Sequence, residues 1–116
     1  MNLSADDIFS ASDSKINQVE IPEWGGTIFV KTMSGIERDK FESDHTRLKK
    51  TGQELYNFRA RFAVCVVCDQ EGTLLFKAED AEKIGCKSAK SLDRIFEAAS
   101  AMNGMTAEDV ETLEKN

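Results

Sequence analysis

Three cysteines and one histidine are the side chains in this sequence with the clearest potential for chemistry, because together they could bind one zinc ion. Cys65 and Cys68 are separated by two residues, which is the spacing of half a structural zinc site, and Cys86 and His45 would supply the other ligands. However, the intervening residues are two valines in an apolar run, whereas zinc-binding pairs usually lie in polar or Gly-containing turns. We therefore expect reduced cysteines that pack as small apolar side chains, with no metal and no other cofactor.

Nucleophilic and acid-base catalysis are also poorly supported. A cysteine nucleophile needs a base within hydrogen-bond reach, and His45 lies in a polar stretch where we expect it to be exposed. Glu79, Asp80 and Glu82 lie where a short helix should begin, and acidic residues stabilise that end of a helix. The Gly-Gly pair at 25–26 lacks the spacing and the following lysine of a phosphate-binding loop. We therefore expect a protein that is not an enzyme.

The composition is that of one globular domain. The 116 residues are 41% hydrophobic and 31% charged, with a net charge of -6 that would repel nucleic acid. No run approaches the roughly 20 apolar residues of a membrane span, and residues 1–20 lack the pattern of a secretion signal. We expect neither nucleic acid nor a membrane among its partners, and we expect a cytoplasmic location.

The first expected elements are an N-terminal arm and a β-hairpin. Residues 1–15 mix Ser, Asp and Ala around the apolar pair Ile8 and Phe9, which indicates a mobile arm with at most a short helical turn. Residues 16–116 would form a single domain. It begins with two antiparallel strands joined by the turn residues 22–26, where two glycines allow a positive φ. Trp24 in this turn would either cover apolar surface or face a partner.

Helices should follow the hairpin. Ser34 and Glu37 have the spacing of a capping box, so a helix should begin there and run to about Leu48, with Ile36, Phe41 and Leu48 as its apolar contacts. Residues 79–84 predict one or two helical turns, and a final helix would begin at Thr106. The clearest pattern lies in residues 88–102, where five apolar residues share one helix face: Leu92, Ile95, Phe96, Ala99 and Met102.

Residues 54–68 are compatible with a helix or with a strand. Apolar residues follow helical spacing from Leu55 to Val66, whereas residues 64–67 have strand propensity. We predict a helix, because so long a stretch without a helix breaker exceeds the usual strand length of about 5 or 6 residues. The whole sequence thus predicts an α+β, mainly helical fold, with an N-terminal β-hairpin followed by four or five helices in one small domain.

Charge is distributed unevenly along the chain. In residues 1–25 five acidic residues oppose one lysine, a net charge of -4, whereas in residues 47–61 five basic residues oppose one glutamate, a net charge of +4. The basic segment is either a solvated surface or a surface that meets an acidic end of a neighbouring copy. The aromatic residues Tyr56, Phe58 and Phe62 lie in or next to this basic segment. Their spacing suits a helix face better than a platform for stacking nucleotide bases.

Several short segments occur in an order that is typical of a known family. They are IPEWGG at 21–26, SGIERDKF at 34–41, RAR at 59–61, CDQEG at 68–72 with Leu75 and Phe76, residues 92–96 with Ala98 and Ala99, MNGM at 102–105, and EKN at 114–116. Each segment is weak by itself, but their shared order over residues 19–116 is specific. Together they resemble the tail assembly chaperones of long-tailed bacteriophages, small proteins encoded just before the tape measure protein.

The resemblance implies a non-enzymatic protein, the short non-frameshifted form, that binds and solubilises the tape measure protein during tail assembly in the host bacterial cytoplasm. It also implies a homo-oligomer that is absent from the mature virion, and a frameshift-extended form that recruits the tail tube protein. It defines no binding residues, so Trp24, Ile8 and Phe9 are our candidate partner-binding residues. The alternative is a small acidic adaptor or regulatory protein that binds a single partner.

A programmed frameshift would leave its mark in the codons of Glu114, Lys115 and Asn116. These residues can be encoded as GAA AAA AAC, which contains the slippery heptamer A AAA AAC, on which paired tRNAs step back by one base. We expect the gene to carry this sequence followed by an overlapping reading frame, which DNA sequencing will test. Codons such as GAG AAG AAT without an overlapping frame would contradict the extended form and leave the short chaperone intact.

Overall fold

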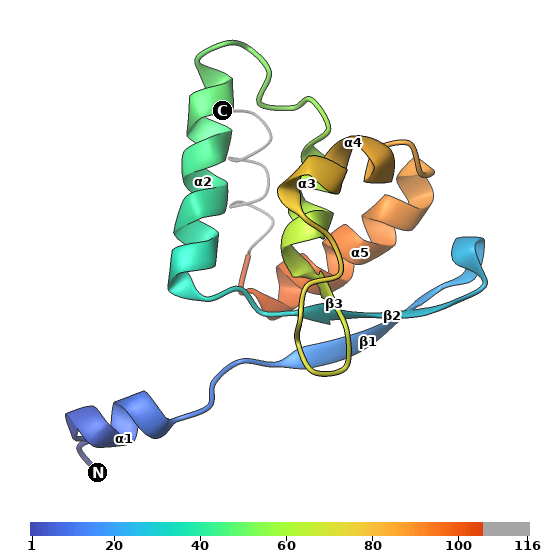
Figure 1. Ribbon diagram of the computed structural model, residues 1–116. Coiled ribbons are helices and arrows are strands. Elements are labelled where there is room, and N and C mark those ends of the chain that lie inside the picture. The colour runs from blue at the N-terminus through green and yellow to red at the C-terminus, as the bar shows by residue number, and fades with distance from the viewer. Residues whose placement is uncertain (106–116) are drawn as a thin grey trace.

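The computed structural model describes residues 1–105, and the helix expected from Thr106 lies outside them. The elements in chain order are α1 (Ala5–Ser10), β1 (Ile16–Ile21), the 3-10 turn η1 (Pro22–Trp24), β2 (Gly26–Lys31), α2 (Gly35–Lys49), α3 (Phe58–Val66), β3 (Val67–Cys68), the 3-10 turn η2 (Ala78–Asp80), α4 (Ala81–Ile84) and α5 (Ala89–Met102). Within residues 1–105, five α-helices and one small antiparallel sheet confirm the α+β, mainly helical fold with its N-terminal hairpin. The helices α3, α4 and α5 cluster above the sheet, and α2 stands beside them (Figure 1).

The sheet has the strand order β1-β2-β3. In the hairpin, Ile16 pairs with Lys31 and Ile21 pairs with Gly26. Gly25 adopts a left-handed conformation with φ of 72°, which only a residue without Cβ takes up readily, whereas Gly26 already belongs to β2. The turn therefore depends on one glycine and not on two, which corrects the expectation from the sequence.

The segment 54–68, expected to be one helix, is divided into a turn, a helix and a strand. The helix begins only at Phe58, because Asn57 adopts a left-handed conformation with φ of 54° and its side-chain amide donates to the carbonyl of Ala81 at 2.8 Å. The helix ends at Val66, since Val67 pairs with Val30 as part of a third strand. The N-terminal hairpin is thus extended by a third strand, which the sequence did not predict.

A capping box begins α2, as the sequence predicts. The Ser34 hydroxyl accepts a hydrogen bond from the amide of Glu37 at 3.2 Å, and the Glu37 carboxylate accepts one from the amide of Ser34 at 2.8 Å. These reciprocal bonds satisfy two amides that the first turn of a helix leaves without partners. The sequence thus fixes where α2 starts, close to the end of β2.

The buried face of α2 differs from the expected one. Phe41 is buried and Leu48 is half-buried, but Ile36 is 83% exposed and His45, expected on the surface, is only 3% exposed. At 100° per residue, His45 and Leu48 follow Phe41 on the same face, whereas Ile36 is rotated away from it. The His45 ring therefore packs edge-on against the ring of Phe58, 5.5 Å between centroids.

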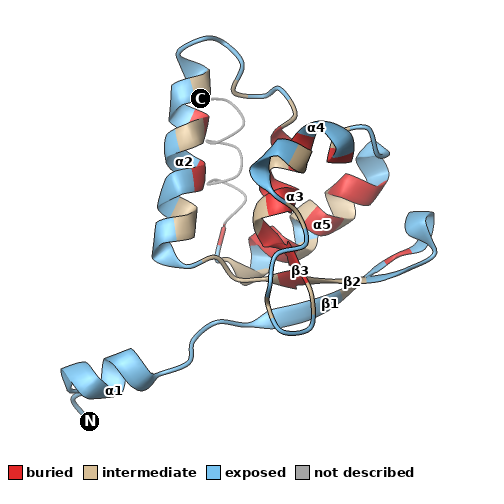
Figure 2. Cartoon of the chain, in the orientation of Figure 1, coloured by how far each residue is buried: buried red, intermediate tan, exposed pale blue. Residues whose placement is uncertain are grey.

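Aromatic rings join the three longest helices. Phe41 of α2 lies 5.8 Å from Phe58 and 5.5 Å from Phe62, both of α3, measured between ring centroids. Phe96 of α5 lies 5.7 Å from Phe58 and 5.2 Å from Phe62. All four pairs are edge-to-face, the arrangement that the quadrupole of the ring favours. Buried positions occur along both α3 and α5 (Figure 2).

The helix α5 confirms the predicted apolar face. Ser88 caps it, Leu92, Ile95 and Ala99 are buried, and Phe96 and Met102 are half-buried. The next residue, Asn103, connects three elements through hydrogen bonds. Its side-chain oxygen accepts from the amide of Met33 at 2.7 Å, and its backbone oxygen accepts from the Arg38 guanidinium at 2.9 Å. The end of α5 is therefore fastened to the link between the hairpin and α2.

We predict that Phe62→Ala lowers the free energy of unfolding by about 3 to 5 kcal/mol, because the ring is fully buried among three helices. Chemical denaturation of the purified chain gives this quantity. Ile36→Ala on the exposed side of α2 is the matched control and should change it by less than about 0.5 kcal/mol. Equal effects of the two substitutions would show that the core is placed wrongly.

Candidate partner-binding site

The cysteines and the histidine do not come together. Cys68 is buried in β3, Cys65 is half-buried in α3, where its thiol lies 3.3 Å from the carbonyl oxygen of Arg61, and Cys86 is exposed after α4. In residues 1–105 no group of three or more His, Cys, Asp and Glu side chains could hold a metal ion. Burial raises the pKa of the Cys65 and Cys68 thiols, which makes both poor nucleophiles near neutral pH.

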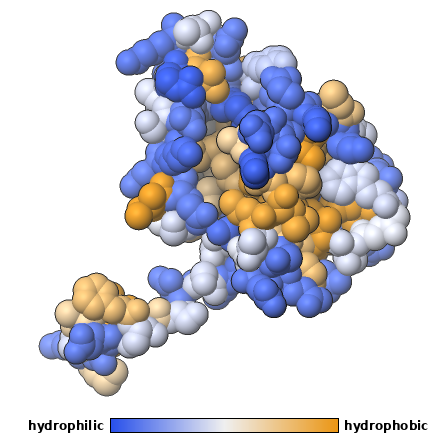
Figure 3. Space-filling view, in the orientation of Figure 1, coloured by the Kyte–Doolittle hydropathy of each residue, from blue (hydrophilic) through white to orange (hydrophobic). Residues whose placement is uncertain are grey.

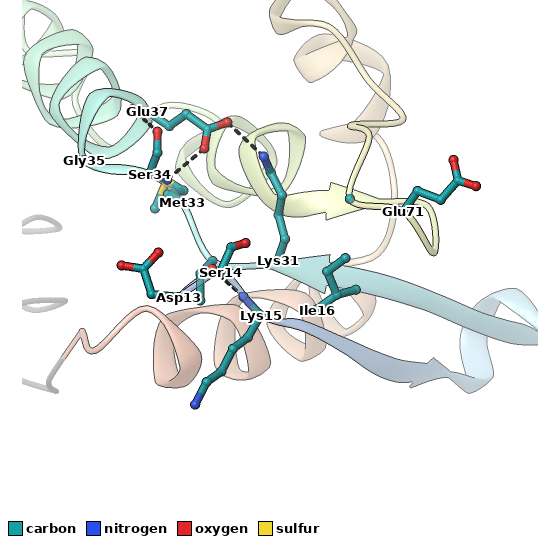
Figure 4. Close-up of a pocket in the computed structure, with 12 residues that line it drawn as sticks. Asp13, Ser14, Lys15, Ile16, Lys31, Met33, Ser34, Gly35, Glu37 and Glu71 are labelled. Carbon is teal, nitrogen blue, oxygen red and sulfur yellow. Dashed lines mark hydrogen bonds and ion pairs between the residues drawn. The ribbon is translucent and has the colours of Figure 1, made fainter. Parts of the chain in front are cut away.

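A hollow of about 410 Å³ lies between the root of the N-terminal arm and the start of α2. Lys31 points toward Glu37 and lies 3.0 Å from it, whereas Lys15 points away (Figure 4). Burial by itself would raise the pKa of Glu37, but the Ser34 amide and Lys31 together lower it below the usual value. Lys31 and Glu37 already form an ion pair at the start of α2, so the role of these two charges is structural.

Trp24 lies at the tip of the hairpin, next to a contact between Glu23 and α5. Arg94 of α5 donates to both carboxylate oxygens of Glu23, at 2.7 and 2.9 Å, and this bonding lowers the pKa of Glu23. The neighbouring Trp24 is 36% exposed, so part of the indole packs on the chain and part of it faces outward. Both alternatives drawn from the sequence, covering apolar surface and facing a partner, thus remain open for Trp24.

The other candidate residues lie on the N-terminal arm, residues 1–15, all of which are exposed. Ile8 is 56% and Phe9 84% exposed on α1, the short helix that the sequence allowed for. The arm extends away from the body on the side opposite to the hairpin tip (Figure 1). The structure therefore does not combine Trp24 with Ile8 and Phe9 into one site.

A further surface, which the sequence analysis missed, is a groove between α2, α3 and the loop after β3. Two adjoining hollows of about 290 and 210 Å³ form it and share Phe41, Val64 and Cys65 in their floor. Leu74 and Phe76 line the end near the loop. Apolar atoms are visible at this hollowed centre of the face (Figure 3). The apolar run at 74–76 was the available signal, but its position beside α2 depends on the tertiary fold.

The rim of this groove is basic. Six charged residues line the two hollows, four of them positive, which gives a net charge of +2: Lys40, Arg47, Arg61, Lys77, Glu37 and Asp44. Glu37 is engaged by Lys31, and Asp44 lies 3.4 Å from Arg47. Arg61 donates to the carbonyls of Glu54 and Tyr56 and covers the Phe58 ring at 5.7 Å. Lys40 and Lys77 are exposed side chains that can meet an acidic partner.

None of the helices in the described part of the chain is long and apolar enough to cross a membrane.

We predict three different thiol reactivities. Cys86 should react first with a thiol reagent, Cys65 more slowly, and Cys68 only on unfolding, because their exposure falls in that order. Mass spectrometry of peptides from partly labelled protein measures this order. Zinc analysis of protein purified without added metal should find none, and stoichiometric zinc or unfolding by a chelator would contradict reduced, metal-free cysteines.

Comparison with known proteins gives one informative similarity. No protein-family model matches the sequence, and no curated protein matches it. Among solved structures, the fold matches the tail assembly chaperone of bacteriophage HK97 with a TM-score of 0.56. The match covers 78% of this chain and 87% of that protein, at 17% sequence identity. This chain therefore has the fold of a phage tail assembly chaperone.

Proposed function

We propose that this chain is a non-enzymatic phage tail assembly chaperone that binds and solubilises the tape measure protein during tail assembly. The observation that carries the proposal is the fold shared with the HK97 tail assembly chaperone over most of both chains. The ordered sequence segments that resemble this family add support that does not depend on the fold.

The physical need for such a protein follows from the chemistry of its proposed partner. A long amphipathic helix exposes an apolar stripe to its own copies and aggregates unless that stripe is covered. This chain offers a partly exposed indole at Trp24, next to the Glu23–Arg94 contact, that suits such a stripe. The proposal includes several copies per partner, residence in the host cytoplasm but not in the mature virion, and a frameshift-extended form that recruits the tail tube protein.

Coexpression with the tape measure protein from the same phage tests the proposal. We expect the tape measure protein to move from the insoluble to the soluble fraction, in a complex that holds many copies of this chain. Light scattering on the purified complex gives the stoichiometry. A tape measure protein that stays insoluble would contradict the proposal, and a compact one-to-one complex with another protein would favour the adaptor alternative.

Trp24→Ala tests the hairpin tip in the same assay. We expect at least a tenfold loss of binding to the tape measure protein, because large aromatic residues often dominate interfaces. The loss of stability should stay below about 2 kcal/mol, since the indole is only partly buried. Tyr56→Ala, also an exposed aromatic residue, is the matched control and should bind normally. Unchanged binding and unchanged stability of the Trp24 variant would exclude the tip from the contact.

A further inference from the structure

We propose that the N-terminal arm of one copy docks in the α2–α3 groove of a second copy, with Phe9 and Ile8 on the apolar floor and Asp6 and Asp7 near the basic rim. This inference deepens the proposed function, because it specifies how copies of the chaperone associate. It assigns Ile8 and Phe9 to a second copy of this chain and leaves Trp24 for the other partner.

The arm has the features of a docking element. Ser4 and Asp7 form a capping box, and Leu3 and Ile8 occupy the positions of a hydrophobic staple, so local sequence specifies α1. Yet a helix of six residues is far below the length of about 12 to 15 residues at which isolated helices become marginally stable. Leu3, Ile8 and Phe9 are all more than half exposed. The short helix α1 therefore needs a partner surface that covers its exposed apolar side chains.

The groove offers a surface of matching size and polarity. Its hollows of about 290 and 210 Å³ both exceed a cavity of about 150 Å³, which is enough to bind benzene. Since the Phe9 ring and the Ile8 side chain project about 100° apart from α1, each could enter one of the two adjoining hollows. The floor residues Phe41, Val64 and Cys65 supply the apolar contacts that these side chains lack in their own chain.

Charge on the two surfaces is complementary. Asp6, Asp7 and Asp13 give residues 1–14 three negative side chains and no positive one. The groove lining has a net charge of +2, and its exposed lysines, Lys40 and Lys77, flank the hollow nearest the loop. An acidic helix is therefore attracted to the groove and oriented in it, whereas a basic or neutral apolar segment would lose this attraction.

The position of the arm favours a second copy as the occupant. Lys15 is tied to Thr32, directly after β2, because its amide donates to the Thr32 hydroxyl and its carbonyl accepts from the Thr32 amide, both at 3.0 Å. Beyond this anchor, Ala11 is extended and α1 lies away from the groove of its own chain (Figure 1; Figure 3). Because arm and groove are different surfaces, the contact can repeat head-to-tail, and successive copies can then line an elongated partner.

Disulfide trapping in the full-length chain tests the contact directly. The variant combines Ser10→Cys at the end of α1 with Cys86→Ser, so that Cys65 in the groove is the accessible target. With an added oxidant, an equal mixture of ¹⁴N-labelled and ¹⁵N-labelled chains should give a 10–65 link that joins both isotopes, and a ladder of linked chains. Adding Cys65→Ser should remove the link. A link found only within single chains would overturn the proposal, as would the absence of any 10–65 link.

Mixing two defective variants provides a second test that needs no tape measure protein. Phe9→Glu replaces the apolar ring of the arm by a carboxylate, and Leu74→Glu places a charge in the groove. Each substitution should weaken self-association at least tenfold in sedimentation experiments. Their mixture should form a one-to-one dimer, through the intact arm of one and the intact groove of the other. Ile36→Glu, exposed and outside the groove, should associate like the original chain.

A monomeric original chain at tens of micromolar, or normal association of the Phe9 variant, would overturn the arm contact. Both results would leave tape measure binding to be judged by coexpression, so the two proposals fail separately. If the original chain is monomeric and the groove becomes protected only when tape measure protein is added, then the groove belongs to that partner and the proposed exchange between copies is wrong.

Discussion

The edge-to-face packing of four phenylalanine rings is the interaction on which the arrangement of the helices depends. Phe41 reaches from α2 to Phe58 and Phe62 of α3, and Phe96 completes the contact from α5. Such rings combine a large apolar area with a preferred angle, so they both drive the helices together and limit their orientation. Because α2 meets the body mainly through this cluster, the space beside Phe41 stays open as the groove.

Polar contacts at the edges of the molecule complete the positioning of its surfaces. Asn103 ties the end of α5 to Met33 and Arg38, while Glu23 and Arg94 hold the hairpin tip against the same helix. These bonds join residues that are 65 to 71 positions apart in sequence. These bonds therefore place the hairpin tip and the start of α2 relative to α5.

The surfaces have chemistry suited to binding. Three surfaces of the described chain could bind other proteins: the partly exposed indole of Trp24, the acidic arm with its apolar side chains, and the basic groove with its apolar floor. Such surfaces agree with the fold shared with the HK97 tail assembly chaperone. The proposed function combines self-association with cover for an apolar partner, and it therefore needs at least two such surfaces. Here the candidate surfaces lie on different parts of the chain, which permits both contacts at once.

The sequence by itself determined the local features, because their causes lie within a few residues. The cap at Ser34 and Glu37, the apolar face of α5 and the capped arm helix all follow from spacing that the chain cannot alter. Only the tertiary structure decided that His45 is buried, since α2 turns the face of Phe41 inward. Likewise, Val67 became a strand because β2 offered a free edge, a contact 37 residues away that overrides helical periodicity. The groove also depends on the tertiary structure: its lining joins residues from α2, α3 and the loop after β3, and no local pattern specifies how far apart those segments pack.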